Sequence, residues 1–206
     1  MSGDKIGTEY PKNPARQKIF NVKDDAKDLG QDRSEIFHSV VAKLLYIFKR
    51  ARPDIEPTIS YLITRVSTSN VDDWEKLKRV LTYLKGSINE IRIIGVRSLK
   101  EIFTWIDAAF AVHDNMRGHT GGSISMGYGI IHGRSGKHKI NTKSSTESEL
   151  VGLSEYLPYT IWLLMFLEVQ EYKIRNSTIY QDNKSAILME RNGKNSCTAN
   201  SRHIYI

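Results

Sequence analysis

The sequence of 206 residues is poor in cysteine and has no long apolar run. The single cysteine, Cys197, excludes a disulfide framework and a cysteine-based zinc site, and it fits a reducing compartment. The apolar run 161–167 is much shorter than the roughly 20 residues that cross a bilayer, so no membrane span is expected. The polar residues at the start lack the apolar segment of a secretory signal.

The composition is that of an ordinary globular protein, with 40% hydrophobic and 26% charged residues. This balance excludes a collagen-like or wholly disordered chain. The formal net charge is +7, because 30 Lys and Arg residues face 23 Asp and Glu residues. An excess of positive charge favours a polyanionic partner such as nucleic acid.

The texture of the chain changes near residue 34. Residues 1–33 are polar and show no apolar period, so we expect a flexible lead-in there. Over 34–87, apolar residues recur at helical spacing in three stretches. Ser34 is the expected N-cap of the first, and the third opens at Asn70 with acidic residues that complement the helix dipole. The sequence therefore predicts a small unit of three packed helices.

Beyond Gly86 the pattern shifts from helical spacing toward alternation. We expect strands at 102–111, 123–131, 138–143 and 177–181, turns at 113–122 and 132–137, and helices at 145–169 and 183–191. The order βββαβα predicts an α/β domain over 88–206. Its mixed sheet would begin with antiparallel hairpins and add a parallel strand through a helical crossover.

Three carboxylates occupy unusual places in this pattern. Asp107 lies inside the most apolar strand, Asp182 follows the last strand, and Glu149 lies near the start of the long helix. A central strand, the end of its neighbour and a helix across them can converge on one point. Three ionised acids cannot share that point without a cation. An all-oxygen site suits Mg²⁺ or Mn²⁺, and two such ions support attack of water on a phosphodiester.

Two of the three carboxylates also have a structural alternative. Glu147 and Glu149 could complement the helix dipole or complete a capping box after Ser144. Asp182 could be the N-cap of the following helix. For Asp107 no inexpensive structural role is apparent, because a charge in an apolar strand costs several kcal/mol unless it is compensated.

Four sequence runs carry a family resemblance: WIDAAFAVHDNMRGHTGG, INTKSSTESELVGLSE, TIYQDNKSAI and NSRHIYI. In this order they resemble the ribonuclease H domain of copia-type retrotransposon Pol polyproteins. The helices before them, ending in EKLKRVLTYLKG, resemble the segment that joins the reverse transcriptase palm to that domain. The resemblance implies a ribonuclease H-like mixed sheet over 88–206, with its last helix cut short.

The resemblance also implies roles for the carboxylates. Asp107 takes the place of the first metal ligand, shared by two ions, and Asp182 that of the third. Glu149 takes the helix-borne ligand position. Glu147 is the alternative, but it is offset by two residues and should face another way. The implied cofactor is Mg²⁺, or Mn²⁺, with two ions.

The implied substrate is an RNA–DNA hybrid, whose RNA strand would be hydrolysed to leave a 3′-hydroxyl and a 5′-phosphate. Candidate contacts to the nucleic acid are Asn183, Arg117 and His203. A basic stripe on the helical unit could follow the hybrid backbone, although a solvated helix face is an equal reading: Lys49, Arg50, Arg52, Lys76, Lys78, Arg79 and Lys85. The further partner is the rest of a Pol polyprotein, in the cytoplasm, a virus-like particle or the nucleus.

One departure from the family pattern keeps a second function open. The family has a fourth carboxylate soon after the closing histidine, where this chain has Tyr205, whose phenol stays protonated at neutral pH. The alternative is thus an inactive fragment or degenerate gene product that at most binds nucleic acid. The Ser-Ser-Thr-Glu and Tyr-Gln-Asp-Asn steps disfavour a resolvase or transposase core of the same fold.

Overall fold

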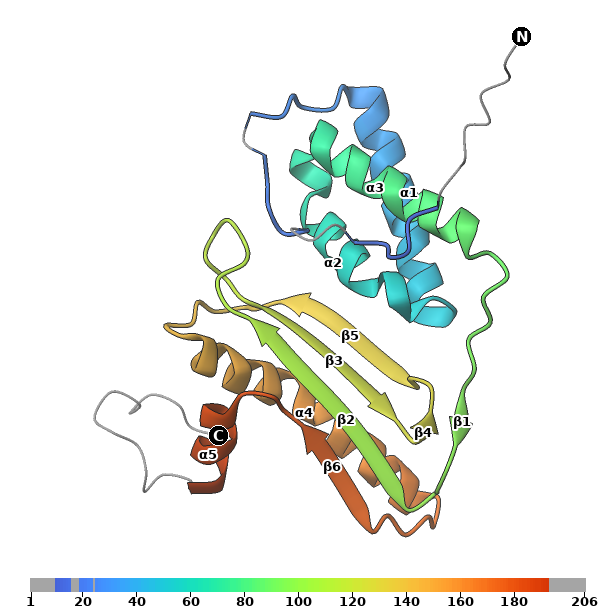
Figure 1. Cartoon of the computed structure of the whole chain (residues 1–206), viewed down its shortest axis with the longest axis vertical. Coiled ribbons are helices and arrows are strands. Elements are labelled where there is room, and N and C mark those ends of the chain that lie inside the picture. The colour runs from blue at the N-terminus through green and yellow to red at the C-terminus, as the bar shows by residue number, and fades with distance from the viewer. Residues whose placement is uncertain (1–9, 16–18, 24, 193–206) are drawn as a thin grey trace, which may run out of the picture. The chain divides into compact units, whose positions relative to one another are not determined.

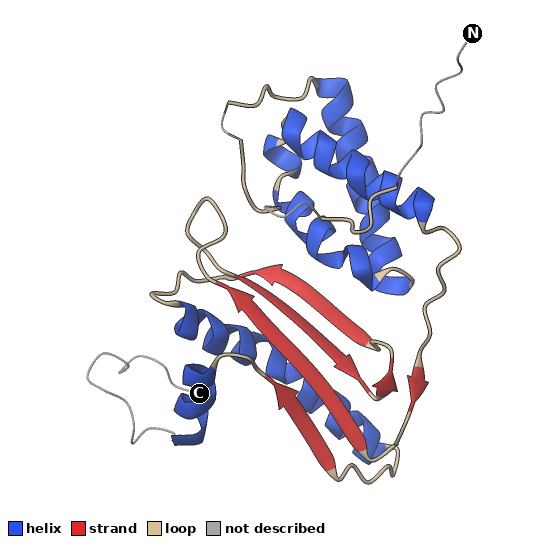
Figure 2. Ribbon diagram, viewed as in Figure 1, coloured by secondary structure: helices blue, strands red, loops and turns tan. Residues whose placement is uncertain are grey.

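The computed structural model describes residues 10–15, 19–23 and 25–192 (Figure 1). The chain divides into two compact units between Ile91 and Arg92. Figure 2 shows that the regular structure of the first unit is helical, whereas the second combines strands with helices.

The first unit contains the three helices that the apolar period predicts. They are α1 (Gln31–Arg50), α2 (Glu56–Thr64) and α3 (Val71–Gly86), with 3₁₀ turns at Pro53–Ile55 and Val66–Thr68. Each helix buries one apolar face in a common core, which includes Phe37, Val41, Leu44, Phe48, Ile55, Ile59, Leu62, Leu77 and Val80. Removal of these side chains from water provides the main stabilisation of the unit.

The structure agrees with one of the two predicted helix starts and differs from the other. Asn70 caps α3 as predicted: its side chain accepts a hydrogen bond from Asp73 N at 3.0 Å, and the Asp73 carboxylate accepts one from Asn70 N at 3.2 Å. The expected N-cap at Ser34 is wrong, because α1 begins at Gln31 after Gly30, which is itself extended. The Ser34 hydroxyl instead lies 3.3 Å from that of Ser69.

The described part of residues 1–33 packs against the helices, which corrects the expected flexible lead-in. Ile19 is buried in the helical core, and the Phe20 ring meets the Tyr61 ring edge-on at 5.8 Å. Asp28 forms an isolated antiparallel bridge with Asn70. Single apolar residues within a polar stretch produce no periodic signal, so the sequence could not reveal this packing.

The second unit is built around a four-stranded mixed sheet, as the sequence predicts. Its strands are β2 (Glu101–Ala109), β3 (His119–Ser125), β5 (His132–Lys137) and β6 (Asn176–Tyr180), in the order β5-β3-β2-β6. The β6 strand is parallel to β2, and the other pairs are antiparallel. Helix α4 (Ser145–Val169) covers one face, and α5 (Lys184–Asn192) follows β6 (Figure 1). The short strands β1 (Gly95–Val96) and β4 (Gly127–Tyr128) pair separately.

The strands of the hairpins begin and end at other residues than the sequence predicts. Residues 132–137, expected as a turn, form β5, whereas 138–143, expected as a strand, lie outside the strands. The β3 strand begins at His119, inside the expected turn. One of its glycines serves packing: a Cβ on Gly122 would lie 2.3 Å from the Tyr156 ring. Glycine here allows an aromatic ring of α4 to approach the strand, and does not mark a turn.

Helix α4 has the predicted bounds but a partly different buried face. The apolar spacing of the sequence predicts a buried face that includes Leu150, Leu153, Ile161 and Leu167. Leu150, Leu153 and Leu167 are buried, whereas Ile161 is 45% exposed. The helix contacts the sheet also through Thr160, whose hydroxyl lies 3.0 Å from that of Thr104 on β2. By length and apolar composition α4 could cross a membrane, and in this structure it packs on β2 and β3.

Candidate metal centre

The structure brings Asp107, Glu149 and Asp182 together, although they come from three different elements. Each offers a carboxylate oxygen, and these three oxygens lie within 4.8 Å of one another. Asp107 is on β2, Glu149 is on α4, and Asp182 follows β6. Asp107 and Asp182 are exposed, whereas Glu149 is buried. The cluster is thus open to solvent on one side and anchored on the other.

Strand register and close helix packing explain this convergence. The last residue pair between the parallel strands joins Trp105 and Tyr180, so continuing the register by two residues places Asp182 beside Asp107. Helix α4 approaches the same strand at Gly152, where a Cβ would lie 3.1 Å from the Ala108 Cβ. Since Gly152 lies one turn after Glu149, this approach holds the Glu149 carboxylate over the strand ends.

The electrostatics of the cluster centre on Glu149. Burial raises the pKa of Glu149, and the negative charges of Asp107 and Asp182 raise it further. Hydrogen bonds from Gln181 and the backbone of Ala108 act in the opposite direction. Gln181 Nε2 donates to Glu149 Oε2 at 3.1 Å, which orients that carboxylate.

This donor set fits a divalent cation. Three carboxylates repel one another while they are ionised, and a hard cation coordinated by oxygen would remove that repulsion. The exposed oxygens of Asp107 and Asp182 leave room for water or a phosphate oxygen in the coordination sphere.

The structural alternatives apply to neighbouring residues. Glu147 has a capping role: its Oε2 accepts from Lys143 N at 2.6 Å, and its own N donates to Ser144 Oγ at 3.1 Å. The N-cap of α5 is Asn183, whose Oδ1 accepts from Ala186 N at 3.0 Å. Asp182 therefore does not have the capping role considered for it, and the Asn183 oxygen is engaged in the helix start.

The other expected contacts are less defined. Arg117 is half-buried in the loop between β2 and β3, two residues before β3 begins. His203 and Tyr205 lie outside the described residues, as does the expected final segment of the domain. Sequence reasoning missed Gln181, which contacts Glu149 although it is uncharged. Its only signal is its place immediately before Asp182 in the run TIYQDN.

The sequence also shows no sign of a histidine cluster that lies at the start of β3. His113 Nε2 lies 3.0 Å from His119 Nδ1, and His119 Nε2 lies 2.7 Å from Ser135 Oγ. Both histidines are buried. Burial, with the nearby positive charge of Lys137, lowers the pKa of His113 to about 4. Burial and the neighbouring histidines lower the pKa of His119 to about 3.

We expect the second unit to lose stability as the pH falls from about 6.5 toward 4. The unfolded chain binds protons at the ordinary histidine pKa, while folded His113 and His119 remain neutral, so acid favours unfolding. Hydrogen exchange of β3 amides, corrected for intrinsic rates, should show less protection at pH 5 than at pH 7. A His113→Gln variant should show a smaller loss over the same range. Equal protection at both pH values in the unmodified chain would contradict the buried neutral pair.

Comparison with known proteins places the chain among retroelement sequences. It is 27% identical over 157 residues to the retrovirus-related Pol polyprotein from transposon TNT 1-94 of Nicotiana tabacum, covering 76% of this chain and 12% of that protein. It is 29% identical over 126 residues to the secreted RxLR effector protein 161 of Plasmopara viticola, covering 61% and 89%. It is 30% identical over 119 residues to an uncharacterized mitochondrial protein of Arabidopsis thaliana, covering 57% and 49%. No family model matches.

A solved structure of the foamy viral protease-reverse transcriptase dRH in complex with ds DNA is also similar. It matches with a TM-score of 0.49 and 14% identity, over 91% of this chain and 30% of that one. This likeness is too low to carry an argument, so the assignment depends on sequence similarity and on the observed topology. The chain spans about an eighth of the tobacco polyprotein and about half of the mitochondrial protein. These similarities agree with the resemblance in the motifs: the chain is a homologue of retrotransposon Pol polyproteins, and its second unit has the mixed α/β sheet expected from that resemblance.

Proposed function

We propose that the second unit hydrolyses the RNA strand of RNA–DNA hybrids, with divalent cations held by Asp107, Glu149 and Asp182. The observation that carries the proposal is the convergence of three carboxylate oxygens within 4.8 Å at the end of the parallel strand pair. Mutual repulsion makes such a cluster unfavourable unless a cation is bound there. The Pol relative supports a role of this kind for the unit.

The three carboxylates have different roles in the proposed reaction. Asp107 and Asp182 present exposed oxygens toward the side from which a substrate would approach. Glu149 is fixed by Gln181, so its carboxylate stays in place without substrate. Bound Mg²⁺ or Mn²⁺ would supply the charge that lowers the pKa of an attacking water and neutralises the scissile phosphate. Selection of the RNA strand would depend on its 2′-hydroxyl.

Cleavage of end-labelled duplexes tests this proposal. With Mg²⁺ or Mn²⁺, the RNA strand of a hybrid should be cut to products with a 3′-hydroxyl and a 5′-phosphate. A DNA duplex of the same sequence should remain intact, and EDTA should stop the reaction. Cutting of the DNA strand, or cutting that persists in EDTA, would refute the assignment.

The second candidate function is binding of the hybrid without cleavage. The observation that favours it is Tyr205, which stands where the family has a fourth carboxylate. In that case the hybrid binds tightly with either ion and no product appears. The remainder of a Pol polyprotein is the proposed partner under both functions, and the cytoplasm, a virus-like particle or the nucleus is the proposed location.

A further inference from the structure

The N-terminal segment lies across helix α3 and forms one wall of a cleft with it. The Tyr10 side chain rests on Gly86, where an added Cβ would lie 2.5 Å from the Tyr10 Cβ. Three residues later, Asn13 Oδ1 accepts a hydrogen bond from Arg79 Nη2 at 3.0 Å. These two contacts hold the intervening backbone along the helix.

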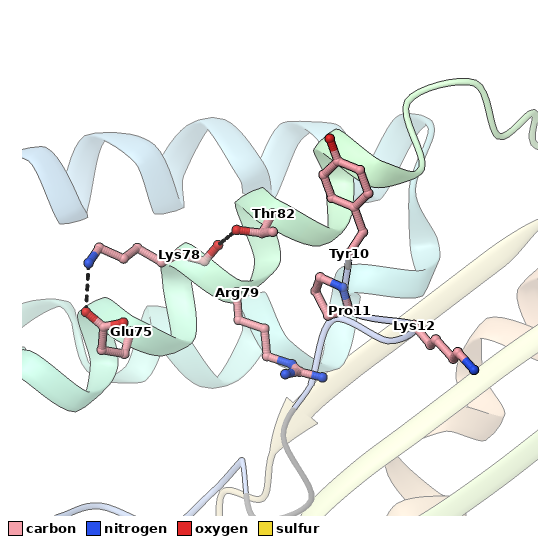
Figure 3. Close-up of a pocket in the computed structure, with 7 residues that line it drawn as sticks. All are labelled: Tyr10, Pro11, Lys12, Glu75, Lys78, Arg79 and Thr82. Atoms are coloured by element: carbon pink, nitrogen blue, oxygen red, sulfur yellow. Dashed lines mark hydrogen bonds and ion pairs between the residues drawn. The ribbon is translucent and has the colours of Figure 1, made fainter. Parts of the chain in front are cut away.

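The cleft between this segment and the helix has a volume of about 560 Å³ and is open to solvent. Figure 3 shows its lining, with the Arg79 side chain extending from α3 toward the segment that carries Pro11 and Lys12. The residues that line it are Tyr10, Pro11, Lys12, Glu75, Lys78, Arg79 and Thr82. Three of them are cationic and one is anionic, so the cleft carries net positive charge.

Ion pairs within the cleft determine which of its positively charged side chains are available to a ligand. Lys78 Nζ contacts Glu75 Oε1 at 2.8 Å, so this pair is internally neutralised. Lys12 is exposed. The Nε of Arg79 is buried and has no hydrogen-bond partner among the described residues. A buried donor without a partner is costly, so the Arg79 guanidinium beside the cleft retains unmet hydrogen-bonding capacity.

The same comparison corrects the basic stripe expected on the helices. Lys76 is buried and contacts Asp72 at 3.1 Å, and Arg52 contacts Asp54 at 2.7 Å. Neither side chain is oriented for an external ligand. The predicted stripe therefore loses Lys76 and Arg52, whereas Lys49, Arg50 and Lys85 remain exposed.

We propose that this cleft binds a backbone phosphate of a nucleic acid. An arginine held by Asn13 is oriented before binding, and a guanidinium matches the oxygens of a phosphate. Lys12 adds a second positive charge from the opposite wall. A phosphate contact confers affinity and position without sequence preference. The nature of the nucleic acid rests on the proposed function, but binding at the cleft requires neither the carboxylates nor cleavage.

Binding of a fluorescent RNA–DNA hybrid, measured by anisotropy in EDTA, tests the cleft separately from catalysis. The variant Lys12→Gln/Arg79→Gln should bind about fivefold more weakly, and its plot of log affinity against log salt should be shallower by about one. The control Arg33→Gln/Lys43→Gln removes the same charge from exposed positions on α1, outside both the cleft and the predicted basic stripe. This control measures the loss of affinity that comes from weaker long-range electrostatic attraction alone, and it should retain most of the affinity for the hybrid. Equal weakening of the two double variants would overturn the proposal.

A charge-neutral variant guards against misfolding and against simple loss of charge. Gly86→Ala displaces Tyr10 and so disturbs the cleft while every cation remains, and it should weaken hybrid binding in the same direction. The last measurement follows hydrogen exchange of α3 in the presence of inorganic phosphate. If phosphate protects α3 from hydrogen exchange while no cleft variant alters hybrid affinity, the cleft takes free phosphate and the proposal is wrong. Loss of binding in the cleft variant with intact cleavage chemistry at saturating hybrid would support it.

Discussion

Replacing Asp107 with asparagine is expected to lower the rate of hybrid cleavage by about 1000-fold or more. The substitution keeps the size and the strand position of the side chain but removes one of the three converging carboxylates. A ligand that binds the cation through charge is then replaced by a neutral amide, and several kcal/mol of transition-state stabilisation are lost. Single-turnover cleavage with saturating Mg²⁺ or Mn²⁺ measures this effect.

Glu147→Gln is the matched control for this prediction. It removes the same charge from a residue two positions before Glu149, where the side chain accepts a hydrogen bond from Lys143 N and is not one of the three clustered carboxylates. Cleavage should remain within about twofold, because an exposed capping contact contributes little to a distant site. If Asp107→Asn retained the full rate, the three carboxylates would not be the metal centre. If both variants lost activity, the loss would be one of folding.

The same substitution should also change the metal-free protein in a specific direction. Negative charge on Asp107 raises the pKa of Glu149, so asparagine at this position lets that pKa fall toward its ordinary value. Relief of repulsion should stabilise the second unit without metal. The additional protection from hydrogen exchange that Mn²⁺ gives to the unmodified protein should be smaller or absent in the variant. A variant that is more stable but inactive distinguishes a functional cluster from a structural one.

The features that the sequence predicts well are those in which a local pattern and a tertiary role agree. Helix α4 begins and ends where its apolar spacing and its Ser144 cap place it. Asp107 was singled out because it interrupts an apolar strand, although the structure exposes its side chain, so the burial cost expected for it does not apply. The convergence of the three acids follows from strand order, since β6 returns parallel to β2 and ends beside it.

The glycine-rich hairpins show where local reading fails. The run HGRSGK has the composition of a turn, yet it pairs along its whole length with β3. What makes it a strand is the neighbouring sheet edge, which satisfies its backbone groups. Gly122 likewise reads as a strand breaker, whereas its role is to make room for Tyr156. Both explanations depend on residues far away in sequence, so no local pattern contains them.

Buried charge in the first unit is a further feature that sequence reading could not place. Lys76 lies in the core, where its Nζ contacts Asp72 Oδ2 and the Tyr61 hydroxyl, each at 3.1 Å, and the Asn21 carbonyl at 2.6 Å. It also lies 4.6 Å from the centroid of the Tyr61 ring. Burial alone would raise the pKa of Asp72, but hydrogen bonds from Lys76 and Lys23 outweigh it and lower that pKa. One ammonium group thus links the N-terminal segment, α2 and α3.

Lys76→Met is therefore expected to destabilise the first unit by about 3–5 kcal/mol. Methionine has a similar shape, but it leaves Asp72 buried with one cation fewer and leaves the Asn21 carbonyl without its donor. The loss should be greatest above about pH 4, where Asp72 is ionised, and should shrink at lower pH as that carboxyl protonates. Hydrogen exchange followed by mass spectrometry reads the two units separately, and amides of α1 and α3 should exchange at least about 100-fold faster.

The neighbouring lysine and the second unit provide controls within one molecule. Lys78 lies on the same helix, is exposed and, among the residues that the structure describes, forms its ion pair with Glu75, so Lys78→Met should cost less than about 1 kcal/mol. Exchange in β2 and β3 should be unchanged in both variants, because those strands belong to the other compact unit. Equal effects of Lys76→Met and Lys78→Met would mean that the buried ion cluster adds no net stability. In that case apolar packing of the three helices alone would maintain the fold of the unit, and the charges would serve only to fix how the N-terminal segment docks.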